Sequence, residues 1–376
     1  MSVTTRKIVP ERVDALLERC RREVDEGLLP SCQVALAQDG EVVVDEAFGD
    51  ATVDTRYSVF SCTKALVAAA MWQLIAEGVV DVGRRVADHL PGFGTNGKDI
   101  VTIEQVMLHT SGFPSAPLGP PRWATSAGRR EAFGRWRLNW EPGTAYEYHP
   151  TSAHWVLAEL VIELTGRDYR DVIEERVTRP LGLGRLLGVT GEQSDIATVV
   201  SVGSPATPGE LEAAVGVREL PVTEVTDEAL LRYNQPEVRE VGVPGGGGVM
   251  RASDLARFYQ ALLHNPGGLW EREVLADGTG RVRNRLPDRY SGVPANRTLG
   301  LVQAGDDGQA AMRGMGRTVS ARAFGHNGAG GQVAFADPAT GLSFAYCTNG
   351  LDANVLRQWR RVGAIASRGG ACTEPF

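Results

Sequence analysis

The sequence contains very little lysine and no concentration of positive charge. Lys7, Lys64 and Lys98 are its only lysines, and arginines supply the other cations of a chain with a formal net charge of −7. Proteins that bind nucleic acids usually carry a basic patch or stripe, and none is visible in this sequence. We therefore expect no nucleic-acid partner, and each lysine stands out against its surroundings.

Long apolar runs and paired cysteines are missing as well. The most apolar stretch, residues 65–80, is interrupted by Gln73 and Glu77 and is too short and too polar to span a bilayer. The five cysteines are widely spaced and form no Cys-x-x-Cys pair, so neither a disulfide framework nor a zinc site is predicted. The first residues lack the apolar segment of a signal peptide. We expect a cytoplasmic protein without a membrane or metal partner.

Apolar and charged residues occur at ordinary levels, 43% and 23%, which indicates a folded protein with a large core. Its 376 residues fit two or three lobes or one large domain. Strand patterns lie near both ends of the chain, over residues 32–37, 41–44, 332–336 and 342–347. Since helical patterns fill the region between them, the sequence predicts a sheet closed by the two chain ends, with a helical lobe inserted.

Helical periodicity accounts for much of the remaining sequence. Helices are predicted over residues 11–24, 61–77, 152–165, 169–177 and 353–367. A capping box from Thr102 to Gln105 opens a short helix, and Ser253 is the predicted N-cap of another. Residues 112–141 show little periodicity and are expected to be irregular. The four glycines 245–248 predict a flexible or tightly turned loop.

The segment Ser61-Cys-Thr-Lys64 opens a helix that is apolar on nearly every face, which is typical of a buried helix. Residues three apart share a helical face, so Lys64 can reach Ser61. The helix N-terminus favours a developing oxyanion, and burial lowers the pKa of a lysine so that it can take a serine proton. An N-capping serine beside a surface lysine would fit the same pattern. The scarcity of lysine and the apolar flanks favour the catalytic interpretation.

Two further motifs follow along the chain, Pro142-Gly-Thr-Ala-Tyr-Glu-Tyr148 and Phe324-Gly-His-Asn-Gly-Ala329-Gly-Gly. Shorter segments accompany them, Leu108-His-Thr-Ser-Gly112 and Pro180-Leu-Gly182. In this order the motifs resemble the serine β-lactamase and penicillin-binding-protein superfamily, and within it the class C β-lactamase-like branch. They are most similar to the family VIII carboxylesterases. Three catalytic motifs in family order are far more specific than any one of them alone.

The resemblance implies an α/β fold of the β-lactamase/transpeptidase type. In such a fold an antiparallel sheet is flanked by helices, and a mainly helical lobe is inserted into it. Residues 1–75 and 250–376 would form the α/β sheet domain, and residues 76–249 the mainly helical domain. The active site would lie in the cleft between the two.

The resemblance also implies roles for individual residues. Ser61 would be the nucleophile that forms an acyl-enzyme, and Lys64 and Tyr148 would share the proton transfers, with the choice of base left open. Tyr146 is the rival of Tyr148 in the same motif, but the spacing from Pro142 favours Tyr148. The backbone N–H groups of Ser61 and Ala329 would form the oxyanion hole. The substrate-binding residues would be His326, Asn327, Gly328 and His149.

The sequence departs from the family at two positions that concern the substrate. The lactamases and peptidases usually have Tyr-x-Asn and Lys-Thr-Gly, whereas this chain has Tyr148-His-Pro150 and His326-Asn-Gly328. The first change removes an amide that would hold a β-lactam or peptide. The second replaces a fixed cation with a mostly neutral histidine, which lowers the attraction for an anionic substrate. Both changes resemble the esterase-like members and favour a neutral ester.

We therefore expect a serine hydrolase that cleaves small-molecule carboxylic esters through an acyl-serine intermediate and uses no cofactor. Three alternatives remain open at this point. The chain could be an acyltransferase of the same fold, a β-lactamase or D-aminopeptidase-type amide hydrolase, or a catalytically inactive binding module. Fold alone does not fix the chemistry.

Overall fold

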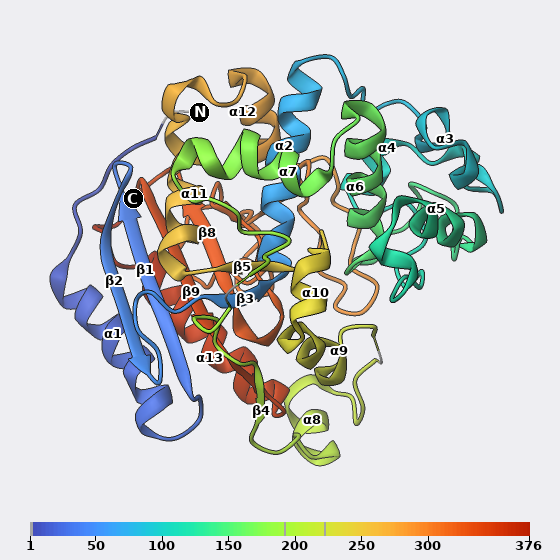
Figure 1. Cartoon of the computed structure of the whole chain (residues 1–376). Helices are drawn as coiled ribbons and strands as arrows, with labels where there is room; N and C mark the ends of the chain where they lie inside the picture. Colours follow the sequence, from blue (N-terminus) through green and yellow to red (C-terminus); the bar gives the residue numbers. More distant parts are fainter. Residues whose placement is uncertain (1–2, 192, 222) are drawn as a thin grey trace.

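The computed structural model describes residues 3–191, 193–221 and 223–376 (Figure 1). The longer helices are α1 (Pro10–Asp25), α2 (Lys64–Ala76), α5 (Ser126–Arg135), α6 (Ser152–Thr165), α8 (Pro208–Val215), α11 (Ala252–His264), α12 (Arg272–Gly280) and α13 (Val355–Gly370). The shorter helices are α3 (Val86–His89), α4 (Ile103–Met107), α7 (Tyr169–Ile173), α9 (Asp227–Leu231) and α10 (Pro236–Val241). Single 3₁₀ turns include η1 (Ser61–Thr63) and η9 (Ala329–Gly331). The strands are β1 (Ser31–Gln38), β2 (Glu41–Gly49), β3 (Tyr57–Phe60), β4 (Val200–Val202), β5 (Gly248–Met250), β6 (Val302–Gln303), β7 (Phe324–Gly325), β8 (Val333–Asp337), β9 (Leu342–Thr348) and β10 (Gly350–Asp352).

One antiparallel sheet joins the two ends of the chain. Over the described residues it has six strands in the order β2-β1-β9-β8-β7-β6. Strand β1, the second in this order, pairs with its hairpin partner β2 on one side and with β9 on the other, where Ala35 lies opposite Ala345. The predicted strands near both ends of the chain and the sheet closed by both chain ends are therefore confirmed, and with them the fold class.

Side chains on this sheet alternate between two hydrophobic cores. On β1, Val34 and Leu36 belong to the core that includes residues of α1 and α13, whereas Ala35 and Ala37 belong to the larger core around α2 and α11. This alternation follows from the two-residue period of a strand. Figure 1 shows α3 to α6 grouped on the far side of α2 from β1 and β2. Helix α2 therefore lies between the sheet and the helical part of the molecule.

Helix α2 is buried on every face, as its composition predicts. The indole N–H of Trp72 donates a hydrogen bond of 2.8 Å to the Leu299 carbonyl. A glycine of α12 allows the close approach of this ring, since a Cβ on Gly278 would lie only 2.4 Å from the Trp72 indole. Packing from all sides fixes the helix, and with it the turn that carries Ser61 and Lys64.

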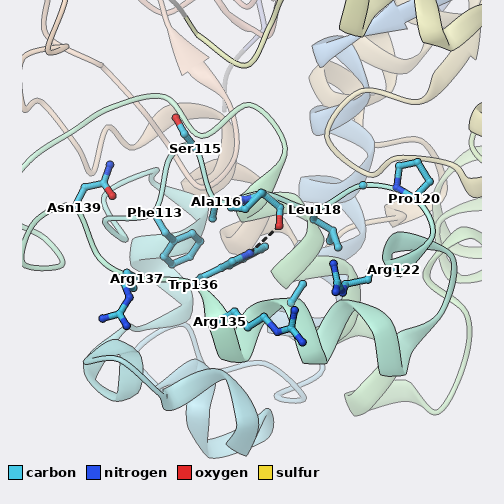
Figure 2. A pocket seen from close by; sticks show the side chains of 13 residues that line it. Phe113, Ser115, Ala116, Leu118, Pro120, Arg122, Arg135, Trp136, Arg137 and Asn139 are labelled. Atoms are coloured by element: carbon cyan, nitrogen blue, oxygen red, sulfur yellow. Dashed lines mark hydrogen bonds between the residues drawn. The ribbon is translucent and has the colours of Figure 1, made fainter.

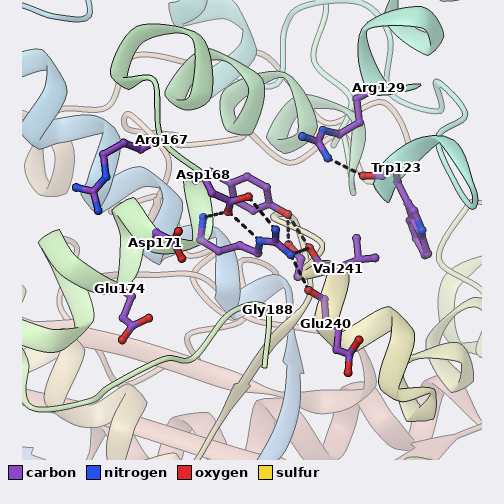
Figure 3. A network of polar contacts seen from close by, with 12 residues as sticks. Trp123, Arg129, Arg167, Asp168, Asp171, Glu174, Gly188, Glu240 and Val241 are labelled. Carbon is purple, nitrogen blue, oxygen red and sulfur yellow. Dashed lines mark hydrogen bonds and ion pairs between the residues drawn. The ribbon is translucent and has the colours of Figure 1, made fainter. Parts of the chain in front are cut away.

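A network of polar contacts fastens the end of α10 to α7 (Figure 3). The Tyr169 hydroxyl lies 2.8 Å from the carbonyl oxygens of both Val241 and Gly242. The neighbouring Arg170 donates a hydrogen bond of 2.8 Å to the Glu240 carbonyl. The glycines 245–248 follow two residues later and are buried; the first three form a tightly turned loop rather than a flexible one, and Gly248 begins β5.

The prediction that residues 112–141 are irregular is wrong, because α5 lies within them. The helix has two glycines and no amphipathic stripe, so its sequence gives little helical signal. Tertiary contacts stabilise it instead: Arg129, on α5, forms an ion pair with Glu159 of α6, and both side chains are buried. Ser126 also donates a hydrogen bond of 2.6 Å to Glu159.

The start of α11 also differs from the prediction. Its N-cap is Arg251 rather than Ser253, which lies inside the first turn. The carboxylate of Asp254 accepts hydrogen bonds from the Arg251 backbone N–H and from its guanidinium, at 2.9 and 3.0 Å. These charge-assisted bonds are stronger than a serine cap, which explains the shift by two residues.

The division of the chain near residues 75 and 250 stays a prediction. Strand β5 straddles the second boundary and pairs antiparallel with β3, the strand that leads into Ser61.

None of the helices in the described ranges is long and apolar enough to cross a membrane.

We predict that Glu159→Ala destabilises the protein strongly, because it leaves the buried Arg129 guanidinium without its partner. Breaking a buried ion pair in this way costs about 3–5 kcal/mol of unfolding free energy. Urea unfolding followed by circular dichroism measures the loss. The control is Glu163→Ala, since Glu163 is 42% exposed and pairs with the half-exposed Arg130. It should cost less than about 1 kcal/mol. Equal losses in the two variants would contradict the role given to the buried pair.

Candidate active site

Ser61 follows β3 directly and begins the turn η1. The residue before it, Phe60, has φ 44° and ψ −126°, a conformation that is costly for a residue with a side chain. Its surroundings hold it there: the Phe60 ring packs edge-on against Tyr233, and Thr63 Oγ1 donates a hydrogen bond of 2.5 Å to the Phe60 carbonyl. Backbone strain of this kind is concentrated at functional sites, and here it sets the direction of the Ser61 side chain.

Lys64 is fully buried and contacts three oxygen atoms from separate parts of the chain. Its Nζ lies 3.0 Å from Ser61 Oγ, 2.7 Å from the Pro150 carbonyl and 2.5 Å from the Gly245 carbonyl. Burial, followed by the positive charge of Arg297, lowers the pKa of Lys64 well below its ordinary value of 10.5. The site therefore favours the neutral amine, which can accept a proton.

Tyr148 completes the group around Ser61. Its hydroxyl donates a hydrogen bond of 2.8 Å to Ser61 Oγ, and Lys64 Nζ lies 5.1 Å from the centre of its ring. Burial raises the pKa of Tyr148, so the phenol stays protonated. Tyr146 points elsewhere, since its hydroxyl accepts a hydrogen bond of 3.0 Å from Arg297. Of the two tyrosines of the motif, Tyr148 is therefore the one that reaches Ser61.

His109 packs against the Tyr148 ring and in turn contacts His149. His109 stacks on the Tyr148 ring with centroids 5.0 Å apart, and its Nδ1 accepts a hydrogen bond of 3.0 Å from the His149 backbone N–H. His149 Nε2 accepts from the Phe113 N–H at 3.2 Å, so its proton resides on Nδ1, which donates to the Glu147 carbonyl at 2.7 Å. Because His149 is fully buried with both ring nitrogens bound to protein groups, its geometry favours a supporting role over the predicted contact with substrate.

His326 lies on the other side of Tyr148, with ring centroids 6.0 Å apart. Its Nε2 is 3.4 Å from Nη1 of Arg297, which can only donate, so the histidine proton lies on Nδ1 and is donated to the Asn327 carbonyl at 2.8 Å. Burial, with the charges of Arg297 and Lys64, lowers the pKa of His326. The neutral state expected for this histidine agrees with its environment. Asn327 is exposed.

The predicted oxyanion-hole residues lie at corresponding places in two turns. Ser61 is the first residue of η1 and Ala329 the first of η9, and the first N–H groups of a helical turn have no partner within it. The segments that carry them are in contact, because a Cβ on Gly328 would lie 2.3 Å from the Val59 carbonyl oxygen. Gly328 thus permits the close approach, while the function of the two N–H groups stays a prediction.

Sequence reasoning missed three residues of this site. Arg297 lies with its guanidinium carbon 5.1 Å from the Tyr148 ring centre, but nothing marks it among the many arginines of the chain. Gly245 supplies a carbonyl to Lys64, which the glycine run did not indicate. The carboxylate of Glu224 accepts hydrogen bonds of 3.1 Å from the Thr151 N–H and hydroxyl, and burial raises its pKa.

A pocket of about 490 Å³ adjoins Phe113, and none of Ser61, Lys64 and Tyr148 is among its lining residues (Figure 2). Its walls come from residues 113–122 and from α5 with the segment that follows it. Trp136 lines the pocket, and its indole N–H donates a hydrogen bond of 3.0 Å to the Pro117 carbonyl, so it also anchors this loop. Phe113 belongs both to the pocket wall and to the hydrogen bonds of His149. Among the described residues no cluster of three or more His, Cys, Asp or Glu side chains is arranged to hold a metal ion.

A serine at a helix start, with a buried lysine and a tyrosine on its hydroxyl, in a fold of antiparallel sheet and helices, defines a class of serine-dependent enzymes. The sequence matches the family described as Beta-lactamase over residues 13–367, and the chain belongs to this family. The resemblance found in the motifs is thereby confirmed.

Individual relatives agree with this assignment. The chain is 29% identical to esterase/beta-lactamase LipL of Mycobacterium tuberculosis, over 85% of this chain and 76% of that protein. It is similar to the crystal structure of a penicillin-binding protein homologue from Caulobacter crescentus, with a TM-score of 0.75, 26% identity and coverage of 98% and 100% of the two chains. It is also similar to a family VIII carboxylesterase, with a TM-score of 0.75, 25% identity and the same coverage.

We predict that the cysteine next to Ser61 is unreactive in the native protein. Cys62 is fully buried, and burial raises the pKa of its thiol to about 12. Treatment with 5,5′-dithiobis(2-nitrobenzoate) at about pH 8 should leave Cys62 unmodified, since the thiolate is the reactive form. The same reagent in guanidinium chloride should label all five cysteines, which is the control. Modification of native Cys62, detected by peptide mass, would show that this turn opens.

Proposed function

We propose that this protein hydrolyses carboxylic esters through an acyl intermediate on Ser61. The observation that carries the proposal is the pair of contacts on Ser61 Oγ: Lys64 Nζ at 3.0 Å on one side and the Tyr148 hydroxyl at 2.8 Å on the other. A nucleophile with a base and a proton donor within hydrogen-bond reach is the arrangement that acyl transfer requires. Esterase/beta-lactamase LipL and the family VIII carboxylesterase support the choice of an ester as substrate.

The contacts of Lys64 suit a general base. In the neutral form its two N–H bonds point to the carbonyls of Pro150 and Gly245, and the lone pair is left for the Ser61 hydroxyl proton. Ser61 Oγ then attacks the ester carbonyl while its proton passes to Nζ. The N–H groups of Ser61 and Ala329 are the proposed donors to the oxyanion that forms.

The proton balance of the cycle closes within the same groups. When the tetrahedral intermediate collapses, the C–O bond to the alcohol breaks, and the Tyr148 hydroxyl is placed to donate a proton to the leaving oxygen as it regains one from Lys64. Water then attacks the acyl-serine with Lys64 as base, the carboxylic acid is released, and the Ser61 hydroxyl is restored. No metal or organic cofactor takes part in this scheme.

We propose that the reaction takes place in the cleft between an α/β part, residues 1–75 and 250–376, and a mainly helical part, residues 76–249. Strands β3 and β5, which pair, join these parts beside Ser61. We also propose a cytoplasmic location, where thiols stay reduced, because the five cysteines are buried and form no disulfide.

We predict that Ser61→Ala abolishes ester hydrolysis and acylation together, because the variant lacks the atom that attacks the ester. The assay is the release of 4-nitrophenol from 4-nitrophenyl acetate and butyrate, and intact-protein mass spectrometry during turnover detects the adduct. The wild type should carry one acyl group, and the variant none, with a rate lower by at least about 10³-fold. An alcohol added to the wild type tests whether water is the acceptor. Undiminished hydrolysis by the variant would overturn the mechanism.

We predict that activity toward a neutral ester depends on the proton of Lys64. The neutral amine is the base, so kcat/KM should rise as the pH rises through the lowered pKa of Lys64 and level off well below pH 10.5. Lys64→Arg keeps the positive charge but cannot lose a proton, and it should lower kcat by about 10²–10⁴-fold at every pH. Tyr148→Phe is the comparison, since it removes the proton donor without changing the base. A wild-type profile that rises only above pH 10 would assign the base elsewhere.

A further inference from the structure

Thr151 binds a carboxylate that comes from a distant part of the chain. Its backbone N–H and its hydroxyl both donate hydrogen bonds of 3.1 Å to Oε1 of Glu224. Thr151 is the N-cap of α6, yet its side chain accepts no hydrogen bond from the first turn of that helix. A threonine at an N-cap commonly makes such a bond. Here its hydroxyl binds Glu224 instead.

The peptide group between Pro150 and Thr151 connects this carboxylate to Lys64. The Pro150 carbonyl accepts a hydrogen bond of 2.7 Å from Lys64 Nζ. The Thr151 N–H belongs to the same planar peptide group and donates to Glu224. Consecutive hydrogen bonds of this kind polarise one another, so the bond to Glu224 makes the carbonyl a better acceptor. A Cβ on Gly245 would lie 2.7 Å from this carbonyl oxygen, so the peptide is also held from the other side.

The charge of Glu224 also acts on the amine of Lys64. Burial lowers the pKa of Lys64 most, the positive charge of Arg297 lowers it further, and the charge of Glu224 raises it. Other titratable groups lie close to the same amine, but burial holds each of them in its uncharged form. They are Cys62, His109, Tyr148, His154 and His326. Among the described residues, Arg297 and Glu224 thus act on Lys64 with opposite charges.

Glu224 also neighbours a residue that supports the nucleophile. Burial raises the pKa of Tyr233, and the charge of Glu224 raises it further. The Tyr233 ring packs edge-on against Phe60, the residue that precedes Ser61, with centroids 5.4 Å apart. A substitution that empties the space of Glu224 could therefore disturb the packing here. An isosteric substitution is needed to separate the charge of Glu224 from its contacts.

We propose that Glu224 is a positioning residue for the base of the reaction. Through Thr151 it holds the Pro150 carbonyl against Lys64, and its negative charge offsets part of the effect of Arg297 on the same amine. The proposal rests on the proposed esterase function and adds the residue that adjusts the basicity of Lys64. Without Glu224 the amine would be a weaker base and would accept the Ser61 proton less readily.

The test is the pH dependence of kcat/KM for 4-nitrophenyl acetate in Glu224→Gln. The amide oxygen of glutamine can still accept the hydrogen bonds from Thr151, but the negative charge is gone. Burial and Arg297 then act on Lys64 unopposed, so its pKa falls further. The acid limb of the profile should therefore shift to lower pH than in the wild type. The plateau should fall by less than about 10-fold, because a less basic amine is a weaker proton acceptor.

Three further variants separate charge from position. Glu219→Gln removes the same charge from an exposed residue that, like Glu224, lies between α8 and α9, and it should leave the acid limb in place. Thr151→Val and Glu224→Asp both retain the carboxylate but loosen its hold on the peptide. Their acid limbs should stay at the wild-type pH, while kcat on the plateau should fall by up to about 10²-fold.

Two results would overturn the proposal. The first is an acid limb in Glu224→Gln at the wild-type pH or above it. The second is an equal shift in Glu219→Gln, which would show a general effect of net charge. If circular dichroism shows that Glu224→Gln is unfolded, Thr151→Val and Glu224→Asp decide. A displaced limb in either would contradict the proposal, and an unmoved limb with a lower plateau would support it.

Failure of the esterase function itself is distinguishable. A fluorophosphonate labels an activated serine by losing fluoride and requires no ester substrate, so its rate of reaction with Ser61 yields the same pH profile. Labelling without ester turnover would contradict the esterase function and still test Glu224. Absence of both labelling and turnover would overturn both proposals.

Discussion

The geometry of the active site depends on one buried amine, that of Lys64. Lys64 forms no ion pair with the described residues; its Nζ is instead surrounded by the Ser61 hydroxyl and two backbone carbonyls, while Glu224 acts on it through its charge. A charged ammonium in this position would cost several kcal/mol, whereas a neutral amine satisfies the two carbonyls and retains its lone pair. The chemistry proposed for Ser61 follows directly from this constraint.

Much of the packing serves to bring these oxygen atoms together. The Pro150 carbonyl is placed just before α6, and the Gly245 carbonyl lies in the tight loop that follows α10, which is itself fastened to α7. Helix α2 is fixed by contacts on every side, including the indole of Trp72. Segments distant in sequence therefore determine whether Lys64 can be neutral, and a shift of about 1 Å in any of them would expose or mispair the amine.

The electrostatic character of the site has a second source in Arg297. Its fixed positive charge lowers the pKa of Lys64 and of His326, and it opposes the effect of burial on Tyr148. Neutral histidines line the site for the same two reasons, burial and a nearby cation. The result is a site with a cation, a neutral amine and a protonated phenol close together. In the proposed mechanism the amine and the phenol activate the serine.

The sequence by itself determined the local features, because they depend on short-range spacing. Local spacing identified Ser61 and Lys64 on one helical face, the capping box at Thr102, and the strand patterns over residues 32–37 and 41–44. The motifs, taken in order, also identified the family and the fold, and Tyr148 as the tyrosine that reaches Ser61.

The features that depend on contacts between distant parts of the chain were decided only by the tertiary structure. Helix α5 forms because Arg129 meets Glu159, and α11 starts at Arg251 because Asp254 binds its backbone and side chain. The lowered pKa of Lys64 depends on its burial and on the positive charge of Arg297, a residue far away in the sequence. Burial and missing partners leave no pattern in a sequence, since they are properties of how distant segments pack.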